Sequence, residues 1–216
     1  MENNLTVGSS NFTLPSSTTF AVGKIYNITR SASGTPTPDP AYTMPANATA
    51  GDVGKLICTD GHIHAYGADA DCTKVRVAKI FYVGSDNGEP APYNHGLALA
   101  LTDESSSRMN WNDAMTACNA KNTSVAVESA TWLLPSSIQW EMMGATSSYY
   151  SSAYENLRDD FTSVEGSNLK YDTEWVGYWS STENDGLPGY AWVFFFDKGL
   201  WYGANDNQLV RACLAF

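Results

Sequence analysis

The chain has few basic residues and no long apolar segment. It contains 12 lysines and arginines against 23 aspartates and glutamates, for a net charge of −11. This acidic balance disfavours nucleic-acid backbones and anionic membranes as partners. No run of 18 or more apolar residues occurs, so we expect no segment that spans a membrane. The first residues also lack the basic and apolar regions of a signal peptide, which fits a cytoplasmic protein, a phage structural protein or a secreted chain without its leader.

The closing segment, residues 178–216, contains no catalytic triad and no phosphate-binding loop. It begins with YWSSTE, ends with VRACLAF, and between them is rich in aromatic residues, glycine, asparagine and aspartate. The whole chain has seven Trp and twelve Tyr, more than packing alone requires, and both residue types favour interfaces. Because exposed aromatics and small polar residues form adaptable binding surfaces, the sequence predicts a recognition surface in this segment.

Cysteine is scarce, and its use is open to two interpretations. The four cysteines are Cys58, Cys72, Cys118 and Cys213, which permit two disulfides in three connectivities. A chain of 216 residues can hold a core without covalent links, so bridges and free thiols both remain open. A Cys58–Cys72 bridge would close a loop of hairpin size.

Composition divides the chain into a short N-terminal part, residues 1–45, and a main domain, residues 46–216. In the first part, FAVGKIYNITR (residues 20–30) predicts a β-strand. It is followed by SASGTPTPDP (residues 31–40), whose proline and glycine content is typical of a linker. We therefore expect a small N-terminal β segment that either packs on the main body or is part of a larger domain.

The main domain is predicted to be α+β. Asn110 or Asn112 is placed to cap a helix over residues 111–121, and Ser136 or Ser137 a second helix that contains Trp140. Between the second helix and residue 174 the pattern indicates little regular structure. Strands are expected at residues 55–58, 62–66, 75–83, 96–101, 190–197, 200–202 and 209–216.

Six motifs in a fixed order give the domain a resemblance to a known family. They are GLALAL, NWNDAMTAC, WLLPSSIQWEMM, YWSSTE, AWVFFFDKG and VRACLAF. Together they resemble the C-type-lectin-fold variable proteins of diversity-generating retroelements, whose typical hosts are gut Bacteroidales and their phages. The resemblance covers about residues 51–216 and implies a C-type lectin-like fold, with two helices and short antiparallel sheets. The segment FAVGKIYNITR in addition resembles the closing strand of a fimbrillin-like or Ig-like surface domain.

The resemblance also implies a function. In that family, adenine-directed mutagenesis rewrites chosen codons, mostly of the Asn type, and a rigid fold displays the resulting side chains. It implies a non-enzymatic binding protein without cofactor or metal, displayed on a cell surface or phage virion, with an unknown protein or glycan as ligand. Trp201 is expected as an anchor although its codon is not reachable by adenine changes. The implied ligand-binding positions are Asn184, Asp185, Gly186, Leu187, Gly189, Tyr190, Val193, Phe195, Asp197, Leu200, Trp201, Tyr202, Gly203, Ala204 and Asn205.

Strand alternation refines this set, because successive side chains point to opposite faces of a sheet. Val193 and Phe195 are expected to be exposed, and Trp192, Phe194 and Phe196 to face the core. The alternative is that all three phenylalanines lie in the core of a sheet covered on both sides. Arg211 is expected as a buried charge partner, and the expected scaffold residues are Trp111, Trp132, Trp140, Trp179, Trp192 and Phe196.

The chain departs from the family at Ala212-Cys213, where Pro-Val is usual. Long-form C-type lectins join their first helix to the last strand by a disulfide, and by that resemblance Cys118 and Cys213 form either such a bridge or two buried thiols. Formylglycine-generating enzymes share the fold and need a reactive cysteine pair. An enzyme of that kind would have to use Cys118 and Cys213 as this pair. We disfavour an enzyme because Cys118 lies on the apolar face of a helix in an acidic chain.

Three further alternatives were weighed. A calcium-dependent glycan-binding lectin would use oxygens from residues 183–185 and 205–207, but these residues also suit ordinary turns. His62 and His64, with Asp60 nearby, resemble part of a metal site, but a third convergent ligand is missing from the pattern. The last alternative is a structural adhesin, pilin-like or tail-fibre protein that uses its C-terminal end for assembly.

Overall fold

The fold is described from a computed structural model, which describes residues 3–7, 10–14, 43–64, 75–146, 153–161, 166–171 and 175–216. The chain divides into two units, Met1–Asp39 and Pro40–Phe216, whereas the sequence predicts the boundary between residues 45 and 46. In the first unit, β1 (Asn3–Val7) pairs antiparallel with β2 (Ser10–Leu14). The strand expected at residues 20–30 lies outside the described residues.

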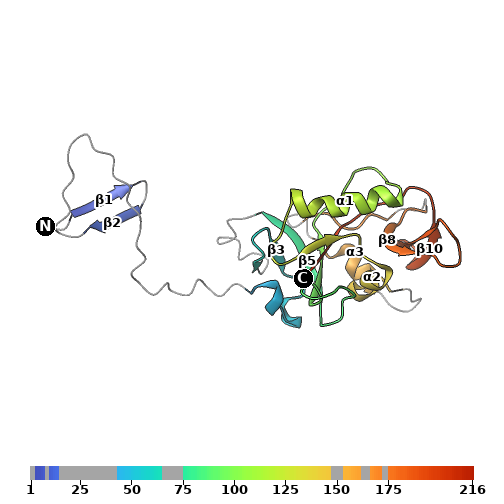
Figure 1. Cartoon of the computed structure of the whole chain (residues 1–216), viewed down its shortest axis with the longest axis horizontal. Helices are drawn as coiled ribbons and strands as arrows, with labels where there is room; N and C mark the ends of the chain where they lie inside the picture. Colours follow the sequence, from blue (N-terminus) through green and yellow to red (C-terminus); the bar gives the residue numbers. More distant parts are fainter. Residues whose placement is uncertain are drawn as a thin grey trace. The chain divides into compact units, whose positions relative to one another are not determined.

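The second unit is a mixed α+β structure built around two antiparallel sheets (Figure 1). The larger sheet has the order β4-β3-β5-β6-β11-β7. The C-terminal strand β11 therefore lies inside this sheet, between β6 and β7, which explains why residues 208–216 are all buried. The six strands are β3 (Leu56–Cys58), β4 (Ile63–His64), β5 (Arg76–Val83), β6 (Gly96–Ala100), β7 (Thr131–Leu133) and β11 (Cys213–Ala215).

Local capping signals place the helices. The Asn110 side chain accepts a hydrogen bond from the backbone of Asp113 at the start of α1 (Trp111–Ser124). Ser136 and Gln139 form a reciprocal capping box at the start of α2 (Ser137–Met143). Both helix starts are confirmed. The structure also contains α3 (Ala153–Asp159) and the short 3-10 helices η1 (Pro45–Asn47) and η2 (Ala50–Asp52).

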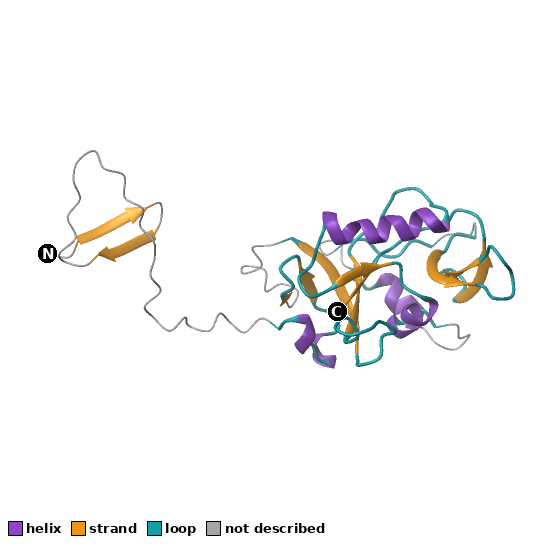
Figure 2. Cartoon of the chain, viewed as in Figure 1, coloured by secondary structure: helices purple, strands orange, loops and turns teal. Residues whose placement is uncertain are grey.

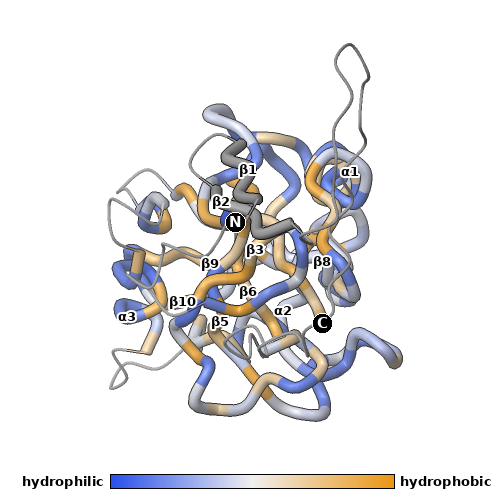
Figure 3. Tube along the Cα trace, turned by 90° about the vertical axis from the view of Figure 1, so that its left-hand side faces the viewer, coloured by the Kyte–Doolittle hydropathy of each residue, from blue (hydrophilic) through white to orange (hydrophobic). Residues whose placement is uncertain are grey.

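Both faces of the larger sheet are covered. Figure 2 shows α1 on one side of the strands, away from α2 and α3. We call the two hydrophobic clusters the α1-side core, which includes Ala114 and Cys118, and the α2-side core, which includes Trp140 and Leu157. Successive residues of β6 alternate between the two clusters. The tube in Figure 3 is accordingly orange along the central strands and largely blue in the surface loops.

The expected buried cation is confirmed at Arg211, whose side chain is fully buried. Its Nε donates to Asp103 Oδ1 at 2.8 Å, and its Nη1 donates to the Ser167 carbonyl at 2.9 Å. The hydroxyl of Tyr178 donates to the same Asp103 oxygen at 2.9 Å, and Lys170 Nζ lies 3.0 Å from Asp103 Oδ2. Burial, together with the negative charge of Asp103, raises the pKa of Tyr178 above its usual range, so its hydroxyl stays a donor. This network joins the segment just before β11 to the residue that begins β8 (Tyr178–Glu183).

Of the two alternatives for Cys118 and Cys213, a bridge or two buried thiols, the second is confirmed, because both residues are free and buried. Cys118 belongs to the α1-side core and Cys213 to the α2-side core, so the sheet separates the two side chains. Cys58 is disulfide-bonded, and Cys72, its expected partner, lies outside the described residues. No helix within the described residues is long and apolar enough to cross a membrane.

Burial raises the pKa of both free thiols far above its usual value, so neither supplies a thiolate at neutral pH. We expect iodoacetamide at pH 8 to leave Cys118 and Cys213 unmodified in the native chain and to alkylate both in guanidinium chloride. Peptide mass spectrometry without reductant measures this. The variant Ser106→Cys, at an exposed position, is the matched control and should react at once. Alkylation of either native thiol at the control rate would contradict the buried placement.

Candidate functional site

The expected recognition segment forms the smaller sheet, in the order β10-β9-β8, at the end of the unit far from β3 (Figure 1). Its further strands are β9 (Ala191–Phe195) and β10 (Leu200–Ala204). Antiparallel pairing sets Tyr202 opposite Val193 and Leu200 opposite Phe195. Directly opposed residues share a face, so these four side chains lie together. The other face carries the pairs Gly203 with Trp192 and Trp201 with Phe194.

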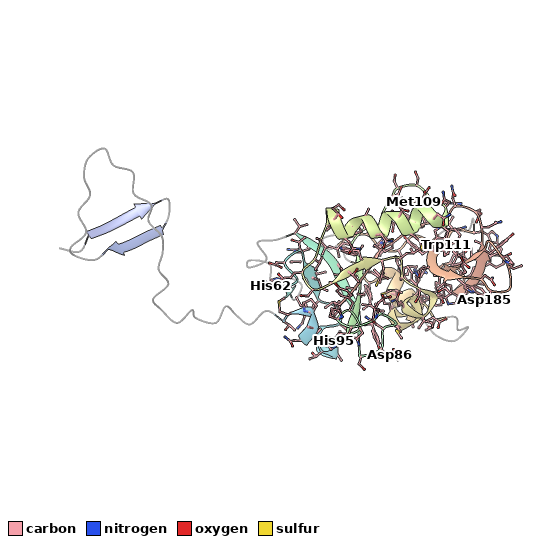
Figure 4. All side chains as sticks on the ribbon, viewed as in Figure 1. His62, Asp86, His95, Met109, Trp111 and Asp185 are labelled. Atoms are coloured by element: carbon pink, nitrogen blue, oxygen red, sulfur yellow. The ribbon has the colours of Figure 1, made fainter. Side chains whose placement is uncertain are left out.

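Tryptophan side chains fix β8 to the rest of the domain. The indole of Trp111 donates to the Ser180 carbonyl at 2.8 Å, and the indole of Trp140 donates to the Trp179 carbonyl at 3.0 Å. Trp179 in turn donates to the Met109 carbonyl at 2.8 Å. Figure 4 labels Met109 and Trp111 at this junction between α1 and the small sheet. The sheet therefore rests on a rigid base, because each buried indole N–H that holds it is satisfied.

The expectation that Val193 and Phe195 face solvent is wrong. Their exposed fractions are 0% and 1%, and both belong to the α1-side core. The physical reason is that the segment before β8 crosses this face of β9. A Cβ on Gly177 would lie 2.6 Å from the Phe194 carbonyl oxygen, so only glycine permits this close approach. The alternative that all three phenylalanines are core residues is confirmed.

One further expectation of burial needs correction. Trp192, expected in the core, is only partly buried. The expected scaffold residue Trp111 is also partly buried, and it packs against the α1-side core. Trp192 and Trp201 lie on the α2 side, where with Ser137 and Glu141 they line a hollow of about 200 Å³. The indole Nε1 of Trp201 is buried there without a hydrogen-bond partner among the described residues. The expected anchor Trp201 thus lies on the opposite face of β10 from Tyr202.

The remaining expected scaffold residues, Trp132, Trp140, Trp179 and Phe196, are buried as predicted. The expected ligand-binding positions differ in exposure. Exposed are Asp185, Gly186, Leu187, Gly189, Tyr202 and Asn205; partly buried are Asn184, Tyr190, Asp197, Leu200 and Trp201; buried are Val193, Phe195, Gly203 and Ala204. The exposed positions therefore come from the β8–β9 loop and from the end of β10.

The β8–β9 loop is held by its own hydrogen bonds. The backbone N–H of Asn184 donates to the Tyr190 carbonyl at 2.8 Å, and the Asn184 Oδ1 accepts from Gly186 at 3.0 Å. Leu187 donates to the Asn184 carbonyl at 2.9 Å. Asp185 lies at the tip of this loop, at the end of the unit opposite His62 (Figure 4). Such a loop can present exposed side chains with a lower cost of ordering its backbone at the moment of binding.

A hollow of about 380 Å³ opens beside this loop and the end of β10. It brings together several expected positions with Trp175 and Gln208, which the sequence interpretation missed, and with Asp206, which it considered only for the calcium-dependent alternative. The signal for Trp175 was a tryptophan in the polar stretch YDTEWVG, where no strand or helix pattern requires it. The lining residues are Trp175, Tyr190, Phe195, Tyr202, Gly203, Ala204, Asn205, Asp206 and Gln208.

Three aromatic rings form one wall of this hollow. The centroid of Trp175 lies 5.7 Å from that of Phe195 and 5.8 Å from that of Tyr202, in edge-to-face and tilted arrangements. Trp175 is 54% exposed and Tyr202 is 52% exposed, whereas Phe195 is buried beneath them. Lys198 Nζ lies 4.1 Å from the centroid of Trp175 and 2.7 Å from Asp197 Oδ2. A cation already neutralised by Asp197 therefore covers part of the indole.

The hollow also has a polar wall, which is fixed by hydrogen bonds. Gln208 is 1% exposed, and its Oε1 accepts from the backbone of Gly177 at 2.9 Å. Its Nε2 donates to Asp206 Oδ1 at 2.9 Å. The bonds of Gln208 hold the loop after β10 against the segment that carries Trp175. Asp206 and Asn205 remain exposed at the rim.

The histidine cluster does not form a metal centre. Ligand atoms of Cys58, Asp60 and His64 lie within 4.8 Å of one another, and His62 Nδ1 lies 3.5 Å from Asp60 Oδ2. Cys58 is disulfide-bonded, however, so its sulfur is not the thiolate that a zinc site requires.

No known protein family matches this chain, and no curated protein is significantly similar to it.

Proposed function

We propose that this chain is a non-enzymatic binding protein with a C-type lectin fold, of the variable type diversified by retroelements. The hollow beside Tyr202 and the adjoining β8–β9 loop would be its recognition surface. The observation that carries the proposal is the separation of roles within one short segment. Exposed residues from the loop and from β10 gather at one end. Of the motifs around them, YWSSTE is buried in its first half and VRACLAF is fully buried. If the exposed residues vary, the buried residues beneath them must keep the fold whichever side chains the surface carries.

The topology supports the C-type lectin part of the proposal. Two main helices, α1 and α2, cover opposite sides of antiparallel strands, and the C-terminal strand closes the larger sheet between β6 and β7. The long connection after α2 leads into a separate small sheet that carries the recognition segment. These features fit a fold in which loops at one end vary while termini and helices stay constant.

Two observations bear on the alternatives of an enzyme and of a calcium-dependent lectin. Burial raises the pKa of the Cys118 and Cys213 thiols, and the two lie in different core clusters, so they are not a reactive pair. At the candidate site, Asn184 Oδ1 and Asp206 Oδ1 are engaged in hydrogen bonds within their own loops, as ordinary turn residues are. The ligand would be a protein or glycan, with the chain displayed on a cell surface or a phage virion.

Sequencing the final coding segment from many independent isolates of this locus tests the proposal. We expect substitutions to concentrate at the exposed positions of 184–190, 202 and 205. Residues 178–182 and 210–216, together with the buried positions 193 and 195, should stay nearly constant because their side chains are packed. The matched comparison is the exposed surface of α1, which should not vary above background. Uniform residues over 184–205 with variation elsewhere would sink the proposal.

A further inference from the structure

We propose that the hollow between Trp175 and Tyr202 binds a neutral saccharide without calcium. This inference rests on the proposed function, since Tyr190, Tyr202 and Asn205 belong to the expected variable set. The inference goes beyond the proposed function in two respects. It names the chemical class of the ligand, and it gives Trp175 a role in binding that ligand. Trp175, Asp206 and Gln208 lie outside that set and would form the constant part of the site.

The aromatic wall provides a stacking surface. Trp175 and Tyr202 are both more than half exposed although each packs on Phe195. Aromatic faces are electron-rich, and the C–H groups on one face of a pyranose ring carry a small positive charge, so the two surfaces attract. The hollow, of about 380 Å³, lies near the lower end of the range of small-ligand sites, about 300–1,000 Å³. It therefore suits one or a few sugar rings.

The backbone of Trp175 indicates that this side chain is held in place at a cost. Its φ of 58° lies in the left-handed region, which is strained for a bulky residue by about 1–3 kcal/mol. The next turn of chain is fixed, because Gly177 donates to Gln208 Oε1 at 2.9 Å and accepts from Leu209 at 2.9 Å. Packing alone gives no reason for an indole that stays 54% exposed. A ligand that stacks on the exposed ring gives one.

The polar wall matches hydroxyl groups. A sugar hydroxyl both donates and accepts, and it pairs well with carboxylates, amides and phenols. Asp206 and Asn205 are exposed at the rim, and Tyr190 lines the same hollow. Gln208 fixes Asp206 through its 2.9 Å hydrogen bond, so part of the polar wall is ordered before a ligand arrives.

Charge selects a neutral ligand over an ionic one. The position over Trp175 that a ligand cation would use is already covered by Lys198 Nζ, 4.1 Å from the ring centroid. An anion would meet the Asp206 carboxylate and a chain of net charge −11, while the charge of Lys198 is neutralised by Asp197 at 2.7 Å. An uncharged, polyhydroxylated ring meets no like charge, and it would stack on the part of the indole that Lys198 leaves uncovered, since Trp175 is 54% exposed.

The test is a tryptophan-fluorescence titration of the full chain, in EDTA, with neutral hexasaccharides of glucose, mannose, xylose and galactose. We expect saturable binding of at least one of them. Trp175→Ala and Tyr202→Ala should each weaken that binding at least about tenfold, which is typical of an aromatic anchor; their affinities are measured by calorimetry because the first variant removes a fluorophore. Tyr171→Ala is the matched control, since Tyr171 is also 54% exposed but does not line the hollow. It should leave the affinity unchanged.

Three results would overturn the inference: no binding of any hexasaccharide, binding that survives both alanine variants, or binding that appears only when calcium replaces EDTA. Thermal unfolding of each variant shows whether a loss of affinity reflects loss of fold. If no saccharide binds but the isolates still vary at the exposed positions, the proposed function stands and only the saccharide inference fails. If those positions are constant but sugar binds through Trp175, the proposed function fails and the saccharide site stands.

Discussion

Replacing Arg211 with methionine should lower the free energy of unfolding by about 3–5 kcal/mol, the range for breaking a buried ion pair by removing one partner. The Arg211 side chain is fully buried and donates to Asp103 and to the Ser167 carbonyl. Its loss leaves the carboxylate of Asp103, itself only 5% exposed, with Lys170 and Tyr178 as partners but without its buried cation. Urea unfolding followed by circular dichroism measures the change.

Arg108→Met is the matched control, because Arg108 is exposed and an exposed substitution changes stability by about 0.5 kcal/mol or less. Arg211→Lys keeps the charge but loses the forked donors, so an intermediate loss is expected. The double variant Arg211→Met with Asp103→Leu should recover part of the loss, because it removes both buried charges. A single variant as stable as the control would contradict the structural role assigned to this pair.

The parts of the fold that the sequence predicted are those with local signals. The start of α1 depends on Asn110 and Asp113, and the start of α2 on Ser136 and Gln139, so each signal lies within four residues. β7 was missed because three residues, Thr131–Leu133, are too few for any periodicity. α3 was missed because its stretch is polar and its buried contribution is mainly Leu157.

The errors at the site have a different cause. Alternation along β9 correctly separated Val193 and Phe195 from Phe194 and Phe196, but alternation contains no information about what covers each face. Both faces are covered here, one of them by a segment that approaches only because residue 177 is glycine. The choice between a Cys118–Cys213 bridge and two buried thiols stayed open for a similar reason, since neither the sequence nor the resemblance says which side of the sheet each thiol occupies.

Phe195→Asn should destabilise the domain by at least about 3–5 kcal/mol, the cost of truncating a buried aromatic ring. Asparagine would in addition place an amide in the α1-side core, which raises the cost unless the amide finds partners. Trp175 and Tyr202 both pack on this ring, so the binding hollow should be lost with it. Urea unfolding gives the stability, and far-UV circular dichroism shows whether the chain still folds.

Tyr202→Asn is the matched control, because Tyr202 lies on the same face of the sheet but is 52% exposed. Its loss should cost about 1 kcal/mol or less. Asparagine is the informative substitution, since Asn-type codons are the ones that the proposed diversification rewrites. If both variants are equally stable, position 195 is free to vary. The assignment of Phe195 to the constant core and of Tyr202 to the variable surface would then be wrong. If only Tyr202→Asn is tolerated, diversity at this end is confined to the β8–β9 loop and the end of β10. Every version of the surface would then share the same wall of Trp175 over Phe195.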